Sequence, residues 1–223
     1  MDHCQIGVLL AYASARGQAL LDRARYLPKE WTQERARCTR AGMPAEQLCA
    51  TKPALARRML EQAFQAGVPA AWVTGESGYG HDRRRRMWRA AQERASGLAV
   101  SGQEDVWLGG QHRQVQTLRA HLPTEGWQRH SAGAGAQGPR CYAWYWLPLA
   151  DPMPPAWRRW LVVRRRLREP TELTASVVFA PPATPVAAAV QGAGARWTIE
   201  SSCEAATGAG GVDHYAVRRW PGW

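Results

Sequence analysis

Two glutamates, Glu76 and Glu200, occupy positions from which carboxylates could perform metal chemistry. Glu76 follows the apolar run AAWVTG, which has the length of a short buried strand, and Glu200 lies in the helix-like segment RWTIESSCEAAT. Ligand crevices of open α/β sheets form at the carboxyl ends of the strands. If both carboxylates reach such a crevice, they can hold magnesium, an ion that prefers oxygen ligands. The alternative is a turn residue at Glu76 and a solvated helix position at Glu200.

Arg83 and Arg84 open a run of four arginines in residues 82–94, a segment whose apolar spacing predicts a helix. The run could contact DNA phosphates near the crevice, because guanidinium groups suit phosphate oxygens. It could also be the solvated face of that helix, with Met87 and Trp88 on the inner side. The solvated face is the simpler interpretation, and both stay open.

The net charge is +11, and nearly all the positive charge is arginine, since Lys29 and Lys52 are the only lysines. An excess of this size attracts polyanions over long distances. The alternative explanation is codon bias in a GC-rich genome, which would account for the same excess together with the many Ala, Gly, Pro and Trp residues. The charge alone therefore identifies no partner.

The five cysteines and six histidines are scattered, without a spacing typical of zinc sites or of catalytic His motifs. Reduced, mostly buried thiols are expected. The first twenty residues lack a charged segment followed by an apolar one, and no apolar run is long enough for a bilayer. These patterns predict a cytoplasmic protein without a membrane partner.

The first hundred residues have the pattern of an α/β unit. Residues 4–14 are apolar on both faces, which predicts a strand in the middle of a covered sheet. Residues 16–50 are expected to be irregular or partly helical. Residues 51–67 predict a helix, with a proline in its first turn and Gly67 as a stop. Residues 70–74 predict a second short strand, and the order strand, helix, strand predicts that it pairs in parallel with the strand at residues 4–14.

The sequence pattern changes after about residue 101, from an α/β pattern to one of short strands and turns. Residues 97–101 predict a third strand, and residues 102–182 contain short alternating strands separated by Gly- and Pro-rich turns. A last helix is expected at residues 185–207, interrupted by Gly192 and Gly194. The predicted organisation is a core segment (1–101), a β-rich insertion (102–182) and a helical return to the core (183–223).

Several segments occur together in an order that is more specific than any single acid. They are CQIGVLLAYAS, YLPKEWT, ATKPALARRML, AGVPAAWVTG, WLVVRR, RWTIE and VDHYAVRRWPGW. This set resembles the DDE transposases of bacterial insertion sequences, of the insertion sequence 701 type, over residues 4–223. The resemblance implies an α/β, ribonuclease H-like fold: a mixed sheet flanked by helices, with a β-rich insertion before the last catalytic helix.

The resemblance also implies a function. Members of this family use three acids, Asp, Asp and Glu, to bind two Mg2+ (or Mn2+) ions and to cut and join DNA. Glu76 stands at the position of the second acid and Glu200 at that of the last, so both would be catalytic residues and metal ligands. Arg196 stands at a family arginine near the last acid and is expected to bind DNA. The expected partners are transposon-end DNA and a second copy of the chain in a homodimer.

The sequence departs from the family at several positions. The first aspartate would lie on a strand before residue 4, Glu76 replaces an aspartate, and Ala193 and Thr207 replace a tyrosine and a lysine. The chain also ends where relatives continue, so the expectation is an inactive copy truncated at both ends. One alternative is a noncatalytic basic DNA-binding module or inhibitor of a full-length transposase. Another is a decayed fragment that does not fold stably, because an apolar strand edge would be exposed.

Overall fold

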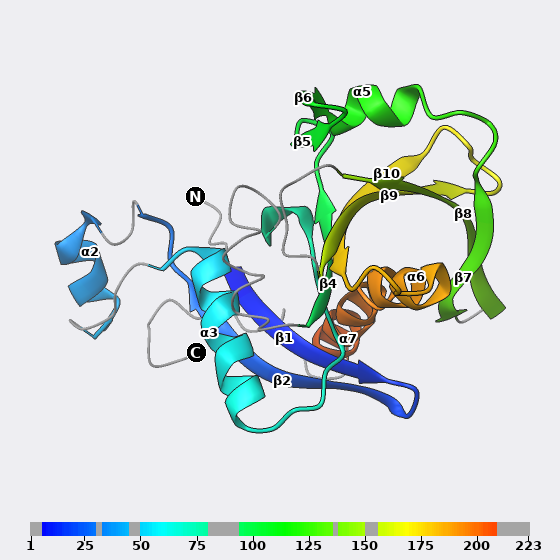
Figure 1. The fold of residues 1–223 in the computed structure, drawn as a ribbon. Helices are drawn as coiled ribbons and strands as arrows, with labels where there is room; N and C mark the ends of the chain where they lie inside the picture. The colour runs from blue at the N-terminus through cyan, green and yellow to red at the C-terminus, as the bar shows by residue number, and fades with distance from the viewer. Residues whose placement is uncertain are drawn as a thin grey trace. The chain divides into compact units, whose positions relative to one another are not determined.

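The computed structural model describes residues 6–29, 33–44, 50–79, 94–135, 138–149 and 156–208. The chain divides into two compact units, one of Met1–Gly67 with Thr198–Trp223 and one of Val68–Trp197 (Figure 1). Arg83 and Arg84, with the helix expected around them, lie outside the described residues. Within the described ranges, no helix combines the length and the apolar character that a membrane span requires.

The first unit contains a β-hairpin, β1 (Ile6–Ser14) and β2 (Gly17–Tyr26), which pair in antiparallel fashion. Helix α3 (Lys52–Gln65) contacts both strands, and it buries Leu55, Met59 and Leu60. The hydroxyl of Thr51 accepts a hydrogen bond from the Ala54 backbone N–H at 3.3 Å, which caps the helix. The described part of this unit also includes α2 (Arg35–Arg40) and most of α7 (Trp197–Gly208).

The prediction of a covered central strand at residues 4–14 is wrong for the described residues. In this part of the chain β1 belongs to a two-stranded sheet with β2, and the side chain of Leu9 is 36% exposed while Val8 is buried. Strand β2 lies in a segment expected to be irregular or helical. Its leucines, Leu20 and Leu21, are each 43% exposed. Because neither face of β2 is buried at these residues, its sequence lacks the alternation of apolar and polar residues that identifies a half-buried strand.

The second unit is built on a six-stranded sheet that curls around helix α6 (Val186–Gly194) (Figure 1). Its strands, in spatial order, are β3 (Trp72–Gly75), β4 (Ala95–Val100), β10 (Leu173–Ala180), β9 (Arg158–Arg166), β8 (Gly138–Pro148) and β7 (Gln128–Gly135). Strands β3 and β4 are parallel, and the other pairs are antiparallel. The parallel pairing expected between the strands at residues 4–14 and 70–74 is wrong for the described residues, because β3 pairs in parallel with β4, whereas β1 pairs with β2 in a separate sheet.

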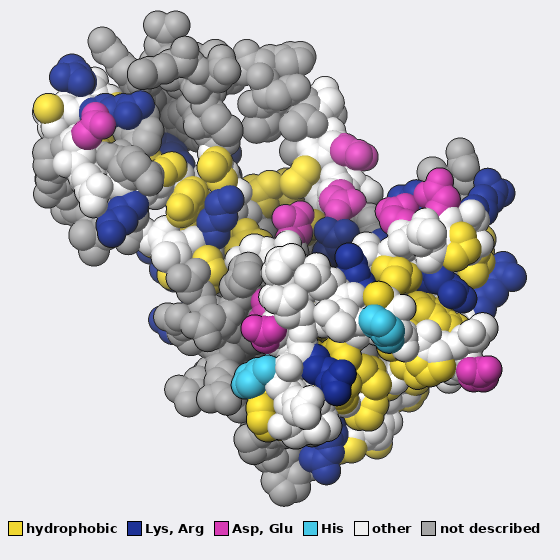
Figure 2. All heavy atoms as spheres, turned by 90° about the horizontal axis from the view of Figure 1, so that it is seen from above, with side chains coloured by type: hydrophobic (Ala, Val, Ile, Leu, Met, Phe, Trp, Pro, Cys, Tyr) yellow, Lys and Arg dark blue, Asp and Glu magenta, His cyan; other side chains and the backbone are white. Residues whose placement is uncertain are grey.

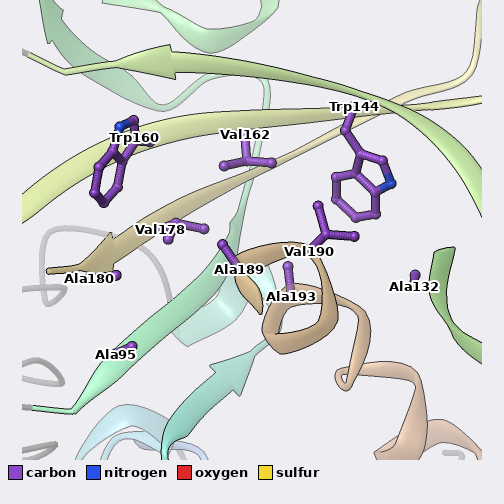
Figure 3. Close-up of a cluster of buried hydrophobic side chains, with 10 residues drawn as sticks. All are labelled: Ala95, Ala132, Trp144, Trp160, Val162, Val178, Ala180, Ala189, Val190 and Ala193. Carbon is purple, nitrogen blue, oxygen red and sulfur yellow. The ribbon is translucent and has the colours of Figure 1, made fainter. Parts of the chain in front are cut away.

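Each face of this sheet carries its own apolar cluster. On the inner face, Trp144, Val162 and Val190 are among the residues that fill the space between the sheet and α6 (Figure 3). On the outer face, Leu161 and Val163 belong to a second cluster. Alternate side chains of β9 thus enter different clusters, which explains why the run WLVV is apolar throughout.

Short elements complete the described part of the second unit. They are the 3₁₀ turn η1 (Ser77–Tyr79), the hairpin of β5 (Asp105–Leu108) and β6 (Gln111–Gln114), and helix α5 (Val115–Ala120). The single interrupted helix expected at residues 185–207 is two helices, α6 and α7, separated by Ala195 and Arg196. The described fold is a mixed α/β arrangement. The domain boundaries expected at residues 101 and 182 stay a prediction.

Candidate functional site

A cavity of about 340 Å³ lies within the second unit, on the inner face of the sheet where α6 ends. Polar side chains from several elements line it: Glu76, Ser77, Arg119, Arg164, Thr174, Ser176 and Arg196. Ala99 and Val100, at the carboxyl end of β4, form part of its apolar wall. The cavity therefore occupies the place where α/β sheets form ligand crevices, beyond the ends of the parallel strands.

Glu76 reaches this cavity because β3 ends at Gly75 and the chain turns into η1. The Tyr79 backbone N–H donates a hydrogen bond to the Glu76 carbonyl at 3.0 Å, so residue 76 also opens the turn. The Glu76 side chain is 60% exposed, and its Oε1 lies 3.9 Å from Nη1 of Arg196. A contact of this length at an exposed position contributes little to stability. Glu76 is thus both a turn residue and a cavity residue.

Arg164 is the most buried charged group of the cavity, with 8% of the residue exposed. Its guanidinium lies 4.5 Å from the centre of the Tyr142 ring. Burial lowers the pKa of Arg164, a side-chain hydrogen bond with Tyr142 opposes this shift, and the positive charges of Arg196 and Arg166 lower the pKa further. Sequence reasoning missed Arg164. The available signal was its place in β9, two residues after Val162 and therefore on the same face.

Among the described residues in Figure 2, Lys and Arg side chains form no single continuous patch. Among the described residues visible there, Lys and Arg side chains lie beside acidic and apolar ones. The cavity differs, because its described lining residues include Arg119, Arg164 and Arg196 but only one acidic residue, Glu76. The local excess of positive charge favours an anionic ligand.

The ionisation of Tyr79 provides a pH-dependent test of the packing around Glu76 and η1. Burial raises the pKa of Tyr79, and the negative charge of Glu76 raises it further. The folded state therefore holds the phenol proton more tightly than the unfolded state does. The resulting stabilisation is complete below the unfolded pKa of about 10 and is lost as the pH rises through the folded pKa. Urea unfolding between pH 9 and 11 should show a fall in stability that is smaller in Tyr79→Phe. Equal slopes in both proteins would contradict this prediction.

Glu200 lies in the first turn of α7, in the first unit, whereas Glu76 and Arg196 belong to the second. The predicted convergence of Glu76 and Glu200 on one metal site stays a prediction. In the part of the chain that the structure describes, no three His, Cys, Asp or Glu side chains lie together in a way that could hold a metal ion. Glu76 offers oxygen atoms that suit Mg2+, but its closest charged partner is Arg196. The described residues of the second unit do not by themselves fit a metal centre.

Comparison with known protein families gives one finding. A family model described as "DDE superfamily endonuclease" matches residues 1–134, more than half of the chain. The matched part includes Glu76, Arg83 and Arg84, and it ends before Arg164, Arg196 and Glu200. No curated protein matches the chain.

Proposed function

We propose a function from the premise that the chain belongs to the DDE superfamily of endonucleases. The chain acts on DNA as a transposase-type domain of the insertion sequence 701 type, with a ribonuclease H-like core. It binds the phosphate backbone of transposon-end DNA, and its cleavage of phosphodiester bonds is slow or absent. A cytoplasmic location and a homodimer are part of this proposal.

The observation that carries the proposal is the joint position of Glu76 and Arg196. Glu76 lies in the family-matched part of the chain, directly after β3, and Arg196 contributes a guanidinium 3.9 Å away at the same cavity. A carboxylate and an arginine at the end of parallel strands suit a phosphodiester substrate, because arginine pairs with phosphate oxygens. In this proposal Glu200 is the last catalytic acid, and Arg83 and Arg84 add further DNA contacts.

DDE superfamily endonucleases generally use divalent metal ions, which supply Lewis acidity at the reacting phosphate when bound. In the proposed function Glu76 and Glu200 would hold Mg2+ or Mn2+. Two features of this chain weaken such a site. Glu76 is one methylene longer than the family's aspartate, and Mg2+ tolerates little deviation from octahedral geometry. Thr207 stands where a lysine would contact a phosphate.

The test of DNA binding is its salt dependence. If three arginines each neutralise one phosphate, affinity for duplex DNA should fall about 40-fold between 50 and 200 mM salt, because each phosphate contact adds about −0.9 to the logarithmic slope. Fluorescence anisotropy with a labelled duplex measures this slope. An affinity that does not change with salt would remove the proposed backbone contacts.

The same preparation is then tested for nicking of supercoiled plasmid with Mg2+ or Mn2+. The expected result is nicking close to the background of the Glu200→Ala variant. Glu204→Ala is the matched control, because Glu204 lies one turn further along α7. Nicking by the wild-type chain and by Glu204→Ala, but not by Glu200→Ala, would show an active enzyme and overturn the claim of impaired cleavage.

A further inference from the structure

The cavity beside Glu76 contains Arg164, an arginine of the segment WLVVRR for which the sequence predicted no role. We infer that this cavity is a phosphate-binding pocket in which the buried Arg164, together with Arg196 and Arg119, binds the oxygens of one phosphate ester group. The inference deepens the proposed function, because the DNA backbone is then the source of the phosphate. Binding of a phosphate group is a separate property that does not require cleavage.

The fold places Arg164 at the floor of the cavity. On the inner face of β9, Trp160 and Val162 belong to the apolar cluster that α6 covers, and Arg164 is the next residue on that face. Helix α6 ends at Gly194, so the sheet surface beyond it remains open to the cavity. The strand neighbours of Arg164 are Trp144 on β8 and Thr174 on β10, and both line the cavity.

The charges around the cavity favour an anion. Arg164 is buried, and the nearby positive charge of Arg196 repels it. A buried cation near other cations is unfavourable unless an anion or hydrogen bonds compensate. Arg166 forms ion pairs with Glu169 at 3.5 Å and Glu172 at 3.0 Å, and none of these three residues is among those that line the cavity. A phosphate between Arg164 and Arg196 would offset their repulsion and accept charge-assisted hydrogen bonds.

The other lining groups suit a phosphate ester. The hydroxyl-bearing residues Thr174 and Ser176 lie on the same inner face of β10, and hydroxyl groups can donate to phosphate oxygens. The Arg119 Nη1 atom donates to the Leu173 carbonyl at 3.1 Å, which holds this third guanidinium at the rim. Ala99, Val100 and Trp144 supply an apolar wall suited to the carbon atoms of an ester.

Calorimetric titration with inorganic phosphate tests the pocket directly. Arg164→Met should lower phosphate affinity at least about tenfold, since a hydrogen bond to a charged group is worth at least that ratio. Arg166→Met is the matched control, because it removes one arginine from the same strand and face but one that pairs with glutamates elsewhere. Wild-type protein without measurable phosphate binding, or equal affinity in both variants, would overturn the inference.

Thermal unfolding separates a binding role from a structural one. A ligand-binding arginine that is buried near like charges contributes little to folding, so the melting temperature of Arg164→Met should equal or exceed that of the wild type. A large fall in melting temperature, or failure of Arg164→Met to fold, would assign Arg164 a structural role and contradict the inference. Phosphate should also raise the melting temperature of the wild type above that in chloride at equal ionic strength.

Competition experiments identify the source of the phosphate. A dinucleoside monophosphate, which contains only a backbone diester, should displace inorganic phosphate from the wild-type chain. Displacement only by a 5′-phosphorylated mononucleotide would overturn the backbone assignment in favour of a phosphorylated end. Phosphate titration, melting temperature and competition test the pocket alone. The proposed function is tested separately, by the salt dependence of duplex binding and by plasmid nicking, so either hypothesis can fail without the other.

Discussion

Gly194→Ala is expected to destabilise the second unit by about 3 kcal/mol or to prevent its folding. A Cβ atom at residue 194 would lie 2.5 Å from the Ala132 carbonyl oxygen and 2.8 Å from the Ala132 Cβ. The carbonyl belongs to strand β7, so the clash requires movement of a strand or of helix α6 rather than a change of rotamer. Urea unfolding monitored by tryptophan fluorescence measures the loss, because Trp144 and Trp160 lie in the affected cluster.

Gly97→Ala is the matched control for this prediction. Gly97 lies on β4 against the same helix, but a Cβ atom there would lie 3.6 Å from the Ala193 Cα and 3.7 Å from the Ala193 Cβ. These are ordinary van der Waals separations, so alanine should fit. The expected change in unfolding free energy is within about 1 kcal/mol, and alanine also reduces the entropy of the unfolded chain. Equal destabilisation by both substitutions would show that the close approach at Gly194 is not responsible.

The two glycines of α6 show one limit of sequence reasoning. Gly192 and Gly194 were expected to interrupt a helix, because glycine has low helix propensity. Gly192 lies inside α6 and Gly194 is its last residue, and both allow close packing: a Cβ at Gly192 would lie 2.4 Å from the Trp72 ring. Propensity describes the cost of glycine in a helix, whereas the benefit depends on a partner that is distant in the sequence.

Local sequence patterns predicted those helices and strands that bury either one face or both faces in the core. Residues 51–67 were predicted as a helix, and α3 (Lys52–Gln65) confirms the prediction, with Gly67 at a φ of +77° after its end. The strands expected near residues 70–74 and 97–101 are β3 and β4. Strand β2 was not predicted, because its exposed leucines follow no alternation that burial would require.

The candidate site was predicted only in part. Glu76 was recognised as a residue at the end of a strand, and the structure places it at the end of β3 on the cavity. Arg164 was not recognised, because its role depends on where α6 ends above the sheet, and no local pattern encodes that position. The convergence of Glu76 and Glu200 stays a prediction, since the two residues belong to separate units.

Leu161→Ala is expected to cost about 3 to 4 kcal/mol of unfolding free energy. Leu161 has no exposed surface and lies on β9 between Val177 of β10 and Leu147 of β8. Removal of its side chain loses the transfer free energy of three carbon atoms and leaves a cavity that the surrounding strands cannot fill by collapse. The loss should be measured by urea unfolding, in the same way as for Gly194→Ala.

Leu167→Ala separates the effect of burial from that of leucine itself. Leu167 follows the end of β9, and 44% of it is exposed, so its replacement should change the unfolding free energy by less than about 0.5 kcal/mol. A small effect at Leu161 would mean that the outer-face cluster of the curled sheet is loosely packed. The inner-face cavity depends on that same sheet, because β9 contributes Leu161 to one face and Arg164 to the other. A well-packed outer face is therefore the condition for a preorganised pocket on the inner face.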